Sequence, residues 1–171
     1  MDFRDKISGA QSELEKLVGS IPGFKGYRDR EMRRDADKLL REQLATRFDE
    51  QRRKLSDLQT QLIGSGQLEF VDDLEGAVMK LQTVIDRLKT ASYGYAGFFD
   101  AIKVNEEQLD TLYAFDNALM SEVEKVAAGI DKVSSAISAK KRVAEAIVDL
   151  RADIQSVNDT LGRREEAILQ V

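Results

Sequence analysis

The sequence contains no cysteine, no histidine and no tryptophan, and it has one proline in 171 residues. Without cysteine the chain cannot form a disulfide, a thiolate nucleophile or a cysteine-ligated zinc site. Without histidine it cannot build the usual catalytic triads or the Glu-x-x-His motif of di-iron bundles. We therefore expect a protein that is not an enzyme and that uses no metal and no cofactor.

Long uncharged runs are also missing. The longest, such as residues 90–99, are far shorter than the ~20 residues that a membrane-spanning helix needs. The first residues, Met-Asp-Phe-Arg-Asp-Lys, do not follow the basic and then apolar pattern of a secretion signal. Acidic residues are interleaved with the basic clusters, and the net charge is −5, which disfavours nucleic-acid binding. We expect a cytoplasmic protein with neither a nucleic-acid partner nor a small-molecule substrate.

What the sequence does contain is charged, periodic helix sequence, with 33% charged and 42% hydrophobic residues. It predicts a single all-α domain over residues 1–171, built as an elongated antiparallel bundle. A short amphipathic helix is expected over residues 1–18, followed by a linker rich in turn residues over 19–27. A long helical hairpin should follow, with helices over about 28–63 and 67–91 joined by Gly64-Ser65-Gly66.

The second half begins with a strong helix start at Asn105, which Gln108 completes as a capping box. An apolar column then recurs every seven residues to Ile168, and only Lys140 interrupts it. The companion column changes sides near residues 138–144. This change permits two interpretations: one continuous helix over about 106–168, or a turn near 138–142. We expect continuity, because the residues are good helix formers and no glycine or proline marks a turn.

A continuous helix would be ~95 Å long and would outrun the hairpin that covers it. We therefore expect a bundle over residues 28–138 and a coiled-coil extension over 139–171. The extension would carry an unpaired apolar seam, which needs a helix from a second copy or from another protein. The predicted oligomerisation seam consists of Val143, Ile147, Leu150, Ile154, Val157, Leu161 and Ile168.

The hairpin brings the linker at 19–27 and the aromatic stretch at 92–105 to one end of the bundle, which we call the aromatic pole. The aromatic residues that we expect to gather there are Phe24, Tyr27, Tyr93, Tyr95, Phe98 and Phe99. They have two interpretations: a hydrophobic plug that seals the bundle, or a docking patch for a protein or lipid. As a docking patch, they would be the partner-binding residues.

These patterns favour a non-enzymatic helical scaffold or adaptor that binds a protein partner and self-associates. The alternative is a peripheral membrane-binding or membrane-remodelling protein that uses the helix at 1–18 or the aromatic pole. The layout of a long helical hairpin behind a short amphipathic helix resembles membrane-remodelling proteins of the phage-shock type. The polar face of the first helix mixes both charge signs, whereas anchors for anionic membranes usually carry a basic face.

Overall fold

The computed structural model describes residues 3–91, 99 and 104–170, except for the side chains of residues 3–8 and 10. The all-α prediction is confirmed, and no strand occurs among the residues described. The α-helices are α1 (Phe3–Ser20), α2 (Arg33–Gly64), α3 (Val71–Thr90), α5 (Glu106–Ala139) and α6 (Val143–Leu169). Two short 3-10 helices precede α2 and α3, at Arg30–Met32 and Leu68–Phe70.

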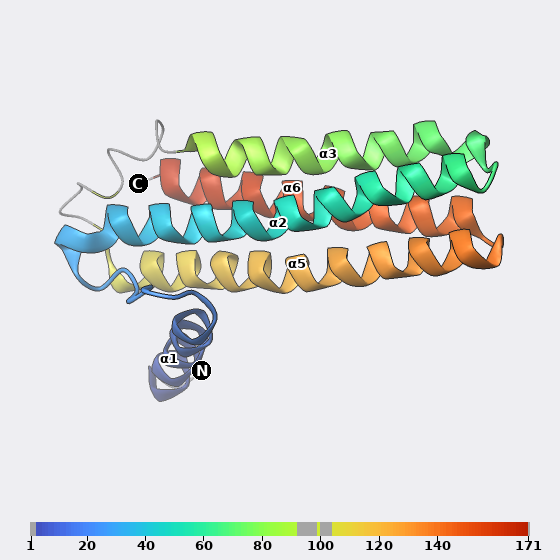
Figure 1. Ribbon diagram of the computed structural model, residues 1–171. Coiled ribbons are helices and arrows are strands. Elements are labelled where there is room, and N and C mark those ends of the chain that lie inside the picture. Colours follow the sequence, from blue (N-terminus) through green and yellow to red (C-terminus); the bar gives the residue numbers. More distant parts are fainter. Residues whose placement is uncertain (1–2, 92–98, 100–103, 171) are drawn as a thin grey trace.

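Four long helices form one elongated bundle, and α1 lies outside it (Figure 1). The pairs that follow each other in the chain, α2 with α3 and α5 with α6, are antiparallel hairpins. The two hairpins lie side by side, with α2 next to α5 and α3 next to α6. Both turns lie at one end, which we call the turn pole, and the aromatic pole is the opposite end.

The hairpin predicted for residues 28–91 is present, but the prediction of one continuous helix over 106–168 is wrong. Helix α5 ends at Ala139, and Lys140 and Arg142 take left-handed backbone angles, with φ of 50° and 57°. The amide of Lys141 donates to the carbonyl of Ala136, and that of Lys140 donates to Ile137, which closes the helix end. The chain therefore turns near 138–142, which was the alternative interpretation.

The coiled-coil extension over 139–171 is also corrected, because α6 folds back as the fourth helix of the bundle. The seven residues of the predicted seam are all buried, at 3% exposure or less. They pack within the same chain, where α5 and α3 flank α6. The change of side in the companion column thus marks the fold-back, and the apolar face needs no second copy to cover it.

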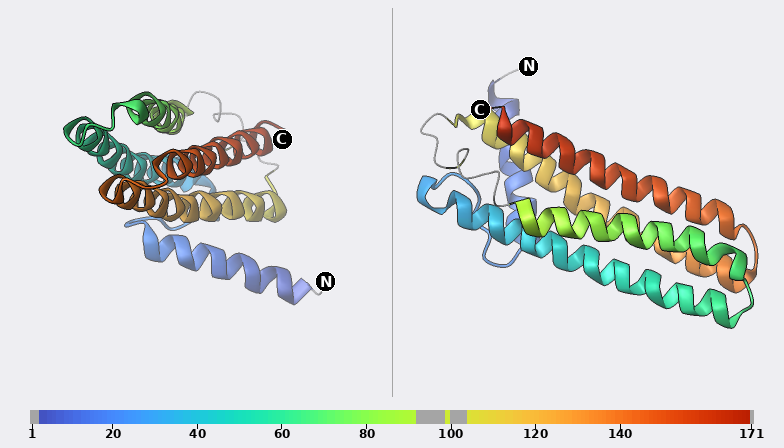
Figure 2. Two further views of the ribbon diagram at one scale, coloured as in Figure 1. Left: turned by 90° about the vertical axis from the view of Figure 1, so that its right-hand side faces the viewer. Right: turned by 90° about the horizontal axis from the view of Figure 1, so that it is seen from above.

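Helix α1 crosses the outside of the bundle near the aromatic pole, where its main contact is with α5 (Figures 1 and 2). Leu17 is buried there, and Leu14 packs against the core from a half-buried position. Asn117 of α5 donates from its side chain to the carbonyl of Glu13 at 2.9 Å. None of the described helices combines the length and the apolar character that crossing a membrane requires.

Candidate functional site at the aromatic pole

The linker between α1 and α2 enters the bundle through Phe24 and Tyr27, both of which are buried. Their rings pack edge to face with centroids 5.6 Å apart, and Tyr27 stacks on Phe99 at 6.2 Å. Tyr27 also packs against Tyr113 of α5 at 5.0 Å. Phe24, Tyr27 and Phe99 are at most 5% exposed, so they form an interior plug and do not offer a surface to a partner. Tyr93, Tyr95 and Phe98 lie outside the described residues.

Gly26 makes this entry possible, because the linker backbone passes very close to other groups. Its φ is +88°, in the region that favours glycine. A Cβ atom at Gly26 would lie 2.5 Å from the Tyr113 hydroxyl and 2.7 Å from Leu14. The approach lets the backbone amide of Tyr27 donate to that hydroxyl at 2.6 Å.

Beneath the plug lies a chain of alternating charges that runs through the core. Asp116 accepts from the Tyr27 hydroxyl at 2.6 Å and from Nε of Arg164 at 2.7 Å. The same arginine donates through Nη2 to Asp37 at 2.6 Å. Asp37 also accepts from Nε of Arg41 at 2.8 Å, and Arg41 donates to the carbonyl of Leu88 at 2.9 Å. The charge chain, meaning these five side chains, joins all four bundle helices to the linker.

The charge chain is balanced, with two carboxylates against two guanidinium groups, and it is shut off from solvent. Burial raises the pKa of Asp116 to about 6, although Arg164 and the Tyr27 hydroxyl both favour its ionised form. Burial, reinforced by the negative charge of Asp116, raises the pKa of Tyr27 well above its usual value. Tyr27 therefore remains a neutral hydrogen-bond donor.

The charge chain was not predicted, although its residues occupy telling positions in the sequence. Asp37 and Arg41 lie seven residues before Leu44 and Phe48, and Asp116 lies seven residues before Val123. Arg164 lies seven residues after Val157. Each charged residue therefore occupies a core position in an apolar column. Charged residues at such positions indicate a buried polar layer.

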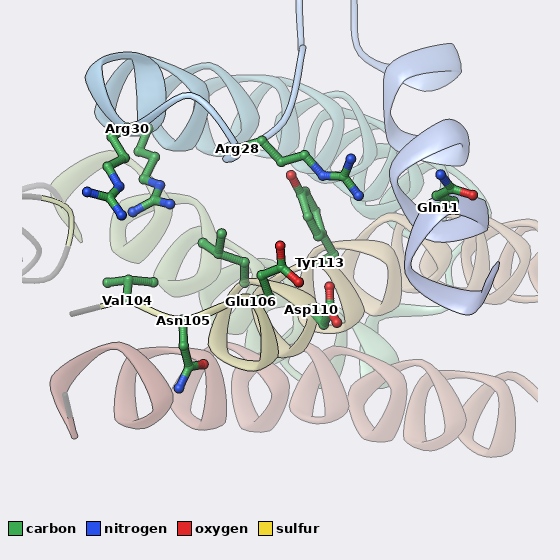
Figure 3. A pocket seen from close by; sticks show the side chains of 10 residues that line it. Gln11, Arg28, Arg30, Val104, Asn105, Glu106, Asp110 and Tyr113 are labelled. Carbon is green, nitrogen blue, oxygen red and sulfur yellow. The ribbon is translucent and has the colours of Figure 1, made fainter. Parts of the chain in front are cut away.

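A pocket of about 710 Å³ opens beside the charge chain, between α1, the linker and the start of α5 (Figure 3). Its lining includes Arg28, Arg30 and Arg33 from one side and Asn105, Glu106 and Asp110 from the other. Gln11 contributes from α1. Asn105 and Gln108 form the predicted capping box, so the first turn of α5 is already capped at this point.

Among the residues that the structure describes, no cluster of three or more histidine, cysteine, aspartate or glutamate side chains has suitable placement for holding a metal ion. The carboxylates of the charge chain are each occupied by arginine or tyrosine donors. The arrangement at the aromatic pole is therefore suited to holding helices and linker together.

In comparisons with known proteins, no protein family, no curated protein and no solved structure matches the chain.

Proposed function

We propose that the chain is a non-enzymatic helical adaptor that binds a protein partner through α1. The observation that carries the proposal is the position of α1 relative to the four-helix bundle. Its C-terminal half is fixed on α5 by Leu17 and by the Asn117–Glu13 hydrogen bond. Its N-terminal end projects past the edge of the bundle (Figure 2).

The sequence of α1 supports a protein as the partner. Phe3 and Ile7 continue, at helical spacing, the apolar stripe whose later members Leu14 and Leu17 lie against α5. An apolar stripe on a projecting helix fits a hydrophobic groove of another protein. The flanking residues carry both charge signs, with Arg4 and Lys6 close to Asp2 and Asp5, which favours a protein groove over an anionic lipid surface.

Self-association through residues 143–168 no longer belongs to the proposal, because those side chains are buried within the chain. The membrane-binding alternative uses the same projecting stripe of α1, so a single pair of variants tests both functions. Phe3→Ser with Ile7→Ser removes the stripe beyond the bundle. Glu15→Ser, on the exposed polar face of the same helix, is the matched control.

The adaptor proposal predicts that a specific protein co-purifies with the wild-type chain and with Glu15→Ser but is lost with the double variant. With that partner purified, the double variant should bind ~10- to 100-fold more weakly, as expected for removal of two apolar anchor residues. Circular dichroism should show equal melting temperatures, which separates loss of binding from loss of folding. Retention of the partner by the double variant contradicts the proposal, and stripe-dependent flotation with liposomes would support the membrane alternative.

A further inference from the structure

Arg33 is the least expected group around the pocket, because it is a buried cation. The residue is 5% exposed, and its Nε donates to the carbonyl of Tyr27 at 2.6 Å. Among the residues that the structure describes, no carboxylate pairs with its guanidinium group. A buried charge is costly unless an opposite charge meets it, so the guanidinium group of Arg33 is suited to receive an anion.

The other charged residues of the pocket lining are Arg28, Arg30, Glu106 and Asp110. Arg30 lies over Val104 at one end of the pocket, whereas Arg28, Glu106 and Asp110 gather around Tyr113 (Figure 3). The two carboxylates therefore lie near Arg28, and they offset the positive charge of Arg28 more than that of Arg30. Because Arg30 and Arg33 also line the pocket, the lining as a whole retains an excess of positive charge.

The size and the remaining lining indicate what kind of anion would fit. A pocket of about 710 Å³ falls within the usual range for small-molecule sites. Val104, Leu109 and Tyr113 add apolar surface to the lining. A pair of guanidinium groups matches the oxygens of a phosphate group, which can accept several charge-assisted hydrogen bonds at once.

We propose that this pocket binds a small organic phosphate, with Arg30 and Arg33 holding the phosphate group. The organic part lies against the apolar lining contributed by α5. The site goes beyond the adaptor function, because it uses neither Phe3 nor Ile7. Gln11 of α1 also lines the pocket, so an occupied pocket touches both α1 and the bundle.

Isothermal titration calorimetry with phenyl phosphate tests the proposal on the full chain. The wild-type protein should bind this probe, and it should bind benzoate, which has the same ring but a carboxylate, at least ten-fold more weakly. Arg33→Gln and Arg30→Gln should each weaken binding of phenyl phosphate by at least ten-fold. Arg53→Gln, which removes an exposed arginine of α2 that does not line the pocket, should leave the affinity unchanged.

Arg30 is exposed, so its variant tests the site even where Arg33→Gln lowers stability. Absence of binding by the wild-type chain at millimolar phenyl phosphate overturns the proposal. Equal weakening by Arg53→Gln also overturns it, because the effect would then reflect overall charge. The double variant Phe3→Ser with Ile7→Ser should bind phenyl phosphate as the wild type does, so this site and the adaptor function can fail separately.

Discussion

The two poles of the bundle use the same seven-residue columns for different purposes. Toward the turn pole the columns are filled by aliphatic side chains, among them Leu62, Leu74, Ile137 and Ile147. At the aromatic pole the columns end in the charge chain, in which every bond has a fixed donor and acceptor. Apolar packing is non-directional, whereas a buried ion pair is stable only when its partners meet in good geometry.

The comparison shows how one chain combines cohesion and specificity. Aliphatic layers stabilise any alignment that keeps the apolar faces together. They therefore favour a bundle but specify the register of its helices only weakly. The charge chain tolerates one arrangement, in which α2, α5, α6 and Tyr27 meet around Arg164. We infer that the charge chain fixes the register of the two hairpins and the entry of the linker.

The largest expected effect follows from removing the centre of the charge chain. Arg164→Ala would leave Asp37 and Asp116 buried without their shared partner. We expect the free energy of unfolding to fall by about 3–5 kcal/mol, as when a buried pair loses one member. Urea unfolding followed by circular dichroism would measure the change.

The adjacent Arg163 provides the matched control, because it is exposed and lies on the same turn of α6. Arg163→Ala should change the free energy of unfolding by less than about 0.5 kcal/mol. Similar losses for the two variants would show that the charge chain does not differ from the surface, and the contrast between the poles would fail.

A smaller effect concerns pH, because the carboxylates that are buried among the described residues, Asp37 and Asp116, both lie at the aromatic pole. The folded-state pKa of Asp116 is about 6, above an unfolded-state value of about 3.9. Between these values the folded chain holds the extra proton, so this group makes the free energy of unfolding fall as pH rises from 4 to 6. Relative to pH 7, its contribution at pH 4.5 is about 2 kcal/mol more stabilising.

The contribution of Asp116 is measured as a difference between variants, since other carboxylates also titrate. Unfolding free energies of the wild type and of Asp116→Asn should be compared at pH 4.5 and pH 7. The variant should lose the gain at pH 4.5, and the exposed Asp149→Asn should keep it. An identical pH dependence in all three proteins would place the pKa of Asp116 near its ordinary value.

The sequence was sufficient for the parts of the fold that depend on local chemistry. Helical periodicity predicted α2 and α3, and the Asn105–Gln108 capping box predicted the start of α5. The charge chain was harder to predict, because its residues lie far apart in the sequence. The one feature that they share there is a position in an apolar column. Asp116 and Arg164 are 48 residues apart, and an ion pair across that separation requires the fold itself.

The break between α5 and α6 was missed because its turn lacks the usual residue. Both turns at the turn pole close in the same way: Gln67 donates to Leu62 and Gly66 to Ile63 in the first, and Lys141 donates to Ala136 and Lys140 to Ile137 in the second. The left-handed position is filled by Gly66 in the first turn and by Lys140 in the second. Glycine is the residue that signals such a helix end, so a lysine there conceals it.

This equivalence gives the smallest predicted effect and a test of the turn pole. Lys140→Gly should raise the free energy of unfolding by about 0.5–1 kcal/mol, because glycine takes the left-handed conformation without steric cost. The reciprocal change Gly66→Ala should lower it by a similar ~1 kcal/mol, since no neighbour lies within 4 Å of the added Cβ and only the backbone conformation opposes it. Thermal and urea unfolding would measure both changes. Effects of the same sign would show that the two turns are not equivalent, whereas opposite signs would show that the fold-back of α6 forms despite a strained lysine, held by the burial of its apolar face.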